Sequence, residues 1–397
     1  MTGDPLLAFR PEFPILETTT YLVSNSLGAM PRSVPDRLAE YVDAWAEQGV
    51  RAWAKGWWSM PVDVGDVIAP LIGAPPGRVA MVPTVSAAHA MVVSALDFPS
   101  ARNEILMTSL DFPSSRYVVE ELAPRLGARI RVVDSDDGIG IDQEKLLAAI
   151  TERTRLVAVS HVLFRSAYIQ DATAICRRAH DMGALVLLDA FHSVGVIPVD
   201  VMTSGADFLA GGVLKWLCGG PGGCFLYSSE HVSATLAPAV TGWQAHRRPF
   251  AFDTEMDYAD GAWRWLGGTP VIPALYAATE GPKLLRRAGI ERIREKSVRQ
   301  TTRLIELADA HGYAVQAPRE AARRGGTVAI DPPHAYEVAQ ALLARDILVD
   351  YRPGAGIRVA PHFYTTDDEV EMAIGEMSAV LATDQWKTFE GQRSVVT

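Results

Sequence analysis

The chain has few cysteines and no long apolar run, and both features limit where the protein can work. Only Cys176, Cys218 and Cys224 occur in 397 residues. Their spacing fits neither a disulfide framework nor a zinc site, and so low a count is typical of a reducing compartment. No apolar run approaches the roughly 20 residues that span a membrane, and the first residues lack the pattern of a signal peptide. We therefore predict a cytoplasmic protein without a membrane partner.

Positive charge is also in short supply. The formal net charge is −10, whereas a nucleic-acid-binding surface depends on clustered positive charge. We therefore expect no nucleic-acid partner and no appended DNA-binding module. Internal repeats and low-complexity tracts are absent as well, which excludes solenoid and fibrous architectures.

What the chain does contain is enough apolar material for a large core. Hydrophobic residues make up 48% of the sequence, and short apolar runs alternate with amphipathic stretches from about residue 60 onward. This alternation predicts an α/β fold: a large domain with a mostly parallel central sheet, and a smaller α/β C-terminal domain. We place an N-terminal segment that packs with the small domain at 1–50, the large domain at 51–275 and the small domain at 276–397.

The pattern also predicts individual elements. Strands are expected at 79–82, 104–108, 129–133, 156–160, 185–188, 207–211, 224–227, 327–330, 348–350 and 356–359. Helices are expected at 33–48, 63–72, 84–96, 116–126, 142–149, 171–182, 336–345 and 367–381. A long amphipathic helix over 273–311 should be broken at Gly281-Pro282 and at Gly289, where helix propensity is low. The tail after Gln385 is expected to be loosely held.

The stretch Leu185–Gly223 carries the strongest chemical signal. One apolar run ends on Asp189, with His192 shortly after it, and the next ends close to Lys215. In open α/β sheets, ligands bind at the carboxyl ends of the strands. The chain has six lysines against thirty-one arginines, and only Lys215 has apolar residues and glycines on both sides. We therefore expect a site where these two strands end.

These residues allow an ordinary and a chemical interpretation. Lys215 can be a surface or ion-paired lysine, Asp189 a helix cap and His192 a structural histidine. A desolvated lysine, however, has a lowered pKa and serves as a nucleophile, most often in a Schiff base with a carbonyl cofactor or substrate. A buried carboxylate beside it suits pyridoxal 5′-phosphate (PLP), whose ring nitrogen must stay protonated.

Other interpretations of the same region are weaker. A metal site built from Asp189, His192 and His161 lacks paired ligand spacing, so we expect no metal. The GGPGG run after Lys215 has no Gly-Lys-Ser/Thr, so a tight turn is favoured over a phosphate-binding P-loop. The tryptophans at 53, 57 and 58 either pack at a boundary or line a substrate pocket.

A series of short motifs then connects these residues to a known group of enzymes. In chain order they are Asn25–Gly28 (NSLG), Thr84-Val85-Ser86, Phe112-Pro113-Ser114, Ser160-His161-Val162, Asp189–Ser193 (DAFHS), Lys215 with GGPGG behind it, Gly242-Trp243, Gly268-Thr269-Pro270 and Gly356–Pro361 (GIRVAP). This ordered series resembles the fold-type I PLP enzymes of the class V aminotransferase group, and among them the kynureninase-like proteins. The resemblance covers about 330 residues.

The resemblance implies PLP as the cofactor, a homodimer with shared active sites and an amino acid as the substrate. It implies that Lys215 forms the Schiff base and later removes the substrate's Cα proton, with Asp189 and His192 as its catalytic partners. The cofactor-binding residues would be Thr84, Val85, Ser86, Phe112, Ser114, His161, Asp189, His192, Lys215, Trp243 and, from a partner chain, Thr269. The substrate-binding residues would be Asn25, Ser26 and Arg358.

The chain departs from the kynureninase pattern at three of these positions. Leu214 stands where kynureninases carry Tyr, Cys218 where they carry Asn, and Ser115 where they often carry Asp. The resemblance therefore implies a side-chain-cleaving hydrolase or lyase whose substrate is open, with a class V aminotransferase as the alternative. Cysteine desulfurase chemistry is not expected, because Cys218 is close to Lys215 and its pattern indicates a packing residue. A PLP-fold regulator and a metal hydrolase are the remaining, less favoured classes.

Overall fold

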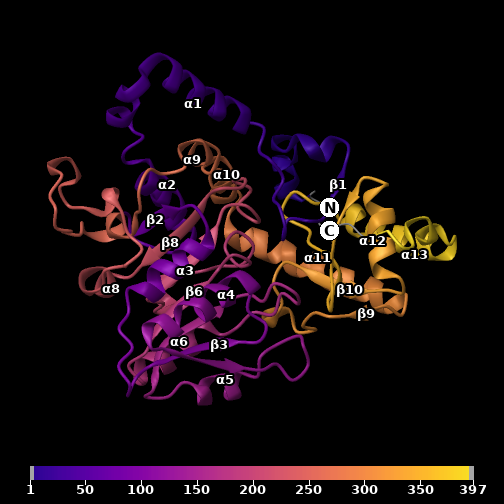
Figure 1. The fold of residues 1–397 in the computed structure, drawn as a ribbon. Helices are drawn as coiled ribbons and strands as arrows, with labels where there is room; N and C mark the ends of the chain where they lie inside the picture. The colour runs from indigo at the N-terminus through magenta and orange to yellow at the C-terminus, as the bar shows by residue number, and fades with distance from the viewer. Residues whose placement is uncertain (1–3, 393–397) are drawn as a thin grey trace.

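A seven-stranded sheet forms the centre of the larger part of the molecule (Figure 1). The computed structural model describes residues 4–392. The strands are β2 (Val79–Val82), β3 (Glu104–Thr108), β4 (Arg129–Val133), β5 (Thr154–Ser160), β6 (Leu185–Asp189), β7 (Phe208–Gly212) and β8 (Cys224–Ser228). Their order is β2-β8-β7-β6-β5-β3-β4, and only the pairings of β8 with β2 and β7 are antiparallel. The predicted mostly parallel sheet is confirmed.

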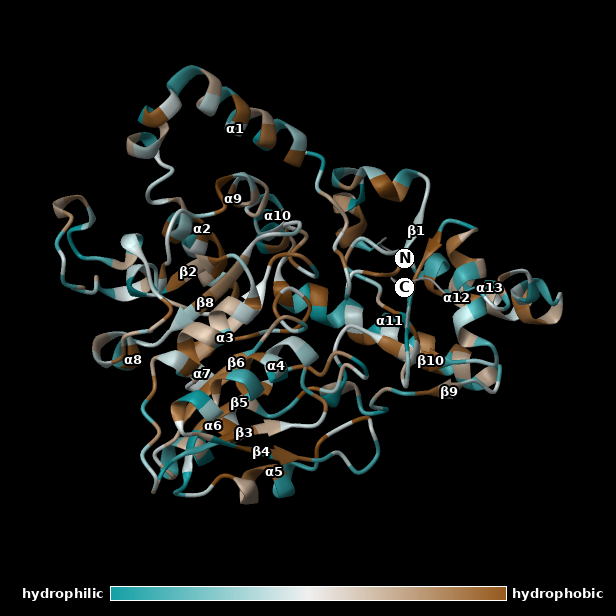
Figure 2. Ribbon diagram, in the orientation of Figure 1, coloured by the Kyte–Doolittle hydropathy of each residue, from teal (hydrophilic) through white to brown (hydrophobic). Residues whose placement is uncertain are grey.

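Helices connect these strands and cover the sheet. They are α2 (Met60–Ile68), α3 (Val85–Ser94), α4 (Pro113–Leu122), α5 (Gln143–Ala149), α6 (Ala172–Asp181), α7 (Val201–Ser204) and α8 (Glu230–Thr235). Parallel neighbours need such crossovers, since a hairpin cannot join them. The central strands are buried almost throughout, which explains their continuous apolar runs. Brown ribbon marks this apolar interior in Figure 2.

A second, smaller sheet lies in the C-terminal part. Its strands, in the order β12-β13-β10-β9, are Asp350–Arg352, Gly356–Val359, Val328–Asp331 and Ala314–Val315, all antiparallel. Helices α12 (Ala335–Leu343) and α13 (Asp367–Ala382) pack with α11 (Ile290–Ala310) around it in a separate apolar core. A short β1 (Thr20–Tyr21) pairs with β11 (Ile347–Leu348) and so joins the N-terminal segment to this part. The exact domain boundaries stay a prediction.

The long helix predicted over 273–311 is three helices: α9 (Ile272–Ala277), α10 (Glu280–Ala288) and α11 (Ile290–Ala310). The second break is at Gly289 as predicted, where φ is +85° and a side chain would be strained. The first break lies at 278–279, before Gly281-Pro282, because proline is tolerated in the first turn of a helix. Helix α1 (Val34–Gln48) lies above the larger part in Figure 1 and packs on α9.

The C-terminal tail is better held than predicted. Gln385–Phe389 form a turn of 3-10 helix, and Trp386 stacks on His334 with ring centroids 3.4 Å apart. The rest of the predicted loose tail, 393–397, lies outside the described residues. Within 4–392, no helix combines the length and the apolar character needed to cross a membrane.

Candidate active site

The two strand ends singled out in the sequence lie side by side. Strands β6 and β7 are parallel neighbours, with Asp189 in register with Ala210. Lys215 follows the end of β7 in a tight turn, and the amide of Gly28 donates a hydrogen bond to the adjoining carbonyl of Leu214, at 2.9 Å. The prediction that Asp189 and Lys215 come from adjacent strands is therefore confirmed.

Lys215 has an amine that loses its proton easily. Burial, followed by the charge of Arg358, lowers its pKa from 10.5 to about 7. Its Nζ lies 2.6 Å from Nε2 of His192 and 4.6 Å and 5.5 Å from the ring centres of Phe191 and Phe112. Burial, aided by the charge of Lys215, holds the pKa of His192 well below 6.5, so its neutral ring accepts a hydrogen bond from the amine.

Asp189 is a buried carboxylate fixed in one orientation. Ser115 Oγ donates to its Oδ2 and the amide of Phe191 donates to its Oδ1, each at 3.0 Å. Carboxylate oxygens have further lone pairs, so Asp189 still accepts a proton-bearing group. Ser115 was noted in the sequence only as a departure from the family pattern. Its contact with Asp189 makes it a positioning residue that the motif comparison missed.

The N-terminus of α3 supplies an anion-binding feature beside this pair of strands. Thr84 caps the helix, and its Oγ1 accepts from the amide of Ala87 at 3.1 Å. Val85 and Ser86 form the first turn, where free backbone N–H groups and the helix dipole favour an anion. Ala87 also lines a cavity of about 220 Å³ with the segment 267–271, which includes Thr269. Thr269 thus lies near α3 within one chain, and its contribution to a partner stays a prediction.

The predicted aromatic and carboxylate-binding residues take up clear positions. Phe112 is the N-cap of α4, with Ser114 in the first turn. Arg358 lies on β13 and is almost fully buried, but it is already paired. Its Nε donates to Oδ1 of Asp350 at 2.7 Å, its Nη2 donates to Oδ2, and its Nη1 donates to the carbonyl of Phe164 at 2.6 Å. Two of its five N–H groups remain for a ligand.

Asn25 has the clearest signature of a missing polar partner. Its side chain is completely buried, and both Oδ1 and Nδ2 lack a hydrogen-bond partner among the described residues. Such groups are costly to bury unsatisfied. The neighbouring Val23 forms a bridge with Ala360, which places this loop close to Arg358. Ser26 follows in the same turn and is half-buried.

Two predicted cofactor-binding residues lie apart from Lys215. The backbone amide of His161 donates to the carbonyl of Asp189 at 2.8 Å, but its ring lines a cavity of about 330 Å³ with Asp171 and Asp200. Burial lowers the pKa of His161 to about 4. Trp243 lies in the loop after α8 and packs on Trp58, with ring centroids 4.9 Å apart. Within residues 4–392 neither side chain contacts Lys215, so their roles stay predictions.

The tryptophans at 53, 57 and 58 do not all have the same surroundings: some pack in the core, and one reaches a more exposed aromatic group. Trp57 is buried, stacks on Tyr41 and donates from Nε1 to the hydroxyl of Tyr276 at 3.1 Å, which is core packing. Trp53 packs edge-on against both Trp57 and Trp58. Only Trp58 continues into the more exposed aromatic group around Trp243.

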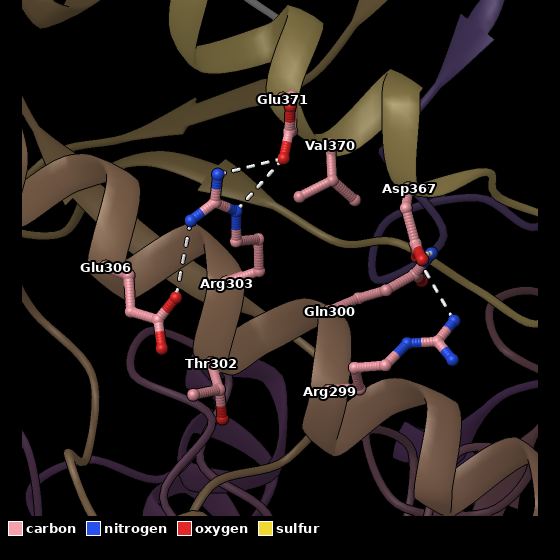
Figure 3. A pocket seen from close by; sticks show the side chains of 8 residues that line it. All are labelled: Arg299, Gln300, Thr302, Arg303, Glu306, Asp367, Val370 and Glu371. Carbon is pink, nitrogen blue, oxygen red and sulfur yellow. Dashed lines mark hydrogen bonds and ion pairs between the residues drawn. The ribbon is translucent and has the colours of Figure 1, made fainter.

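Two larger hollows lie outside this site. An apolar one of about 770 Å³ is lined by Leu27, Met30, Leu38 and the glycine turn 219–222. Another, of about 420 Å³, lies between α11 and α13 (Figure 3). The charged groups drawn there pair with one another, as Arg303 with Glu371 at 2.9 Å and Arg299 with Asp367 at 3.1 Å. Each of the two arginines and three carboxylates that line this hollow already has an ion-pair partner.

The residues around Lys215 fit PLP. The lysine amine can react with an aldehyde, the Asp189 carboxylate can hold a protonated ring nitrogen, and the start of α3 can bind a phosphate. The Phe112 ring lies close enough to Lys215 to stack on a flat ring joined to it. Fold and site together define a fold-type I PLP-dependent enzyme.

The comparisons with known proteins agree with this class. The chain belongs to the class-V aminotransferase family, whose pattern matches residues 20–371. It is a PLP-dependent amino-acid enzyme of the kynureninase-like type. A kynureninase from Pseudomonas fluorescens is 33% identical over 96% of this chain and 94% of its own length. A kynureninase from Burkholderia pseudomallei (strain 1106a) is 31% identical over 99% of this chain and 97% of its own length.

Solved structures show the same fold at lower identity. A cysteine desulfurase from Thermococcus onnurineus NA1 superposes with a TM-score of 0.84 at 22% identity, covering 96% of this chain and 99% of that one. The cystine C-S lyase C-DES, in complex with cysteine persulfide, superposes with a TM-score of 0.83 at 20% identity. The match covers 92% of this chain and 99% of that one. At these identities the similarity establishes the fold alone.

Proposed function

We propose that the protein cleaves the side chain of an α-amino acid, as a hydrolase or lyase that carries PLP on Lys215. When bound, the cofactor supplies an aldehyde carbon and an electron-withdrawing ring. The observation that carries the proposal is the amine of Lys215, with a pKa of about 7 and a neutral histidine 2.6 Å away. Near-full-length similarity to kynureninases supports side-chain cleavage over transamination.

Lys215 is the base in this proposal. A base works best when its pKa lies close to the working pH, and a lysine with a pKa of about 7 is half deprotonated at neutrality. Neutral His192 accepts a hydrogen bond and therefore directs the amine without adding a second positive charge. Asp189, fixed by Ser115, would keep the ring nitrogen of the bound cofactor protonated.

Arg358 and Asn25 receive the substrate's α-carboxylate. Asp350 holds the Arg358 guanidinium in place, so its two remaining N–H groups are preorganised for a carboxylate. The orphaned amide of Asn25 offers a further donor, and a bound substrate would satisfy it. Ser26 lies in the same turn and belongs to this proposed subsite.

We further propose that a second copy of the chain covers the apolar face beside the site. Leu38, Val42 and Trp45 leave 38%, 57% and 62% of their surface exposed on α1. Leu38 also lines the apolar hollow that reaches the glycine turn behind Lys215. Sedimentation should show a dimer, and Trp45→Asp should shift it to monomer while the surface change Lys55→Asp should not. A wild-type monomer would refute this proposal.

The compartment is proposed from the cysteines. All three are free and buried, and they lie in different parts of the fold. We propose a reducing, cytoplasmic setting, which cell fractionation tests directly.

A substrate panel tests the proposed reaction. The purified holoenzyme is incubated with amino acids that include L-kynurenine, and side-chain products, keto acids and the amine form of the cofactor are measured. Released side-chain fragments with little amine-form cofactor support the proposal. Stoichiometric amine-form cofactor without cleavage would establish an aminotransferase instead. Because Leu214 stands where kynureninases carry Tyr, L-kynurenine is only one of the substrates to be tried.

A further inference from the structure

Two arginines act electrostatically on Lys215 although the protein as a whole is acidic. Arg358 and Arg352 both add to the effect of burial in lowering the pKa of Lys215, so both guanidiniums lie within its electrostatic range. Arg165 belongs to the same group, because it follows Phe164, whose carbonyl accepts from Arg358. We call Arg165, Arg352 and Arg358 the arginine cluster. Against a net charge of −10, such a local excess is a specific feature.

A single carboxylate pairs with two members of the cluster. Oδ2 of Asp350 is shared between Arg358 and Arg352, and its distance to Nη2 of Arg352 is 3.1 Å. Arg352 also donates from Nη1 to the carbonyl of Tyr351 at 2.9 Å, which leaves its Nε and further N–H groups free. The side chain of Arg352 is 32% exposed, so these donors are accessible.

Arg165 has no carboxylate partner among residues 4–392. It is exposed, and its guanidinium carbon lies 5.4 Å from the ring centre of Phe164. It also approaches the turn that follows Arg352, since a Cβ on Gly354 would lie 3.8 Å from Nη1 of Arg165. This contact places the guanidinium of Arg165, with its five N–H groups, near the turn that follows Arg352.

An aromatic path joins this cluster to the reactive amine. The ring of Phe112 lies 5.5 Å from Nζ of Lys215 and packs edge-on against Phe164, with centroids 5.1 Å apart. A side chain attached at Lys215 and running along Phe112 and Phe164 would end beside Arg165.

The charges then do not balance for a substrate with one carboxylate. Asp350 offsets one arginine, and the substrate's α-carboxylate offsets Arg358, so one positive charge is left over. We propose that the substrate is an α-amino acid whose side chain ends in an anionic group, a carboxylate in the simplest case, which Arg165 and Arg352 bind. This inference rests on the proposed function, since it assumes an amino acid at Lys215.

Equilibrium binding of unreactive ligands tests the inference separately from catalysis. The holoenzyme, shown to carry its cofactor by visible absorption, is titrated by calorimetry with dicarboxylates of increasing length and with the matching monocarboxylates. We expect one dicarboxylate to bind about tenfold more tightly than its monocarboxylate, and the advantage to shrink in high salt. Equal affinities at every length would overturn the proposal.

Variants assign the effect to the cluster. Arg165→Gln removes an exposed charge whose guanidinium has no hydrogen bond within residues 4–392, so folding should be preserved. It should weaken binding of the dicarboxylate about fivefold and leave binding of the monocarboxylate unchanged. Arg352→Gln should abolish the preference, and Arg352→Lys should keep part of it. Arg129→Gln also removes an exposed charge, from the start of β4 at the far edge of the sheet, and should change neither affinity.

The outcomes are distinguishable from failure of the proposed function. A protein without the Lys215-linked absorption would refute the function before any ligand is added. A holoenzyme that cleaves amino acids but binds mono- and dicarboxylates alike would keep the function and refute this inference. If both Arg165→Gln and Arg352→Gln still prefer the dicarboxylate, other residues bind the second anionic group, which also refutes this inference.

Discussion

Arg358 is held by Asp350 through two parallel hydrogen bonds, one of them 2.7 Å between Nε and Oδ1. Asp350 and Arg358 are in register on the antiparallel strands β12 and β13, and both are buried. The arginine predicted to bind the substrate carboxylate is thus already neutralised on one side. Its position is fixed before a ligand arrives.

Replacing Asp350 by Asn should destabilise the protein strongly. The change leaves a buried guanidinium without its anion, and breaking one side of a buried pair costs about 3–5 kcal/mol. Urea denaturation measures the free energy of unfolding, and KM should rise in the same variant. The matched control is Asp331→Asn, an exposed carboxylate on the neighbouring β10, which should lie near wild type. Equal stability of both variants would contradict the buried-pair account.

Lys215→Met should stabilise the apoprotein in a pH-dependent way. The folded-state pKa is about 7 against 10.5, so the unfolded chain binds more protons between these values and wild-type stability rises with pH there. The cost of the buried ammonium is fully present below pH 7 and is relieved above 10.5. The melting-temperature gain of Lys215→Met should therefore be largest below pH 7 and vanish above 10.5. A pH-independent gain would point to packing instead.

The rate of cofactor incorporation should follow the neutral amine. Since only the unprotonated lysine attacks an aldehyde, the rate at which the apoprotein develops visible absorption with PLP should rise through pH 7 and then level off. Lys215→Ala should show no such band and no borohydride-stable adduct, whereas the exposed-lysine variant Lys55→Ala should behave as wild type. A rate still rising steeply towards pH 10.5 would mean that the amine is not perturbed.

Gly28→Ala should damage the site without altering a functional group. A Cβ on Gly28 would overlap the carbonyl oxygen of Lys215 and crowd Cys218, so the turn that carries the lysine must shift. We expect weaker PLP retention on dialysis and a lower kcat by about tenfold or more. Gly375→Ala, where nothing lies within 4 Å of the added atom, is the control and should retain both properties.

Cys218 occupies a strained backbone conformation that distinguishes it from Cys224. Its φ is +51°, in the left-handed region that costs an L-residue roughly 1–2 kcal/mol, and a β-branched side chain fits there worst. Cys218→Val should therefore lose at least about 1 kcal/mol more stability than Cys224→Val, which lies on an extended strand. Thermal denaturation of the two variants compares them, and equal losses would argue against strain. The family's Asn at this position tolerates the same conformation.

The alternation of apolar runs was enough to predict most elements of the fold. Continuous apolar runs became buried strands of the central sheet, and breaks such as Gly289 were visible because glycine ends helices. The errors were at the first break of the 273–311 helix, in the C-terminal tail, and at the strand expected over 348–350, where the chain forms two short strands, β11 and β12. The first break is displaced because proline is tolerated in the first turn of a helix, whereas the tail is held by a distant contact, the stacking of Trp386 on His334.

The sequence by itself determined the chemistry at the strand ends. A lone lysine among apolar residues and glycines, one strand away from a carboxylate, already indicated a nucleophile and its partner. The sequence could not determine how charges are shared, because that depends on residues far apart in the chain. Only the tertiary structure placed Ser115 on Asp189, Asp350 on Arg358, and Arg165 near the turn that follows Arg352. Burial, which the fold alone decides, lowers the pKa of Lys215 and makes that amine reactive.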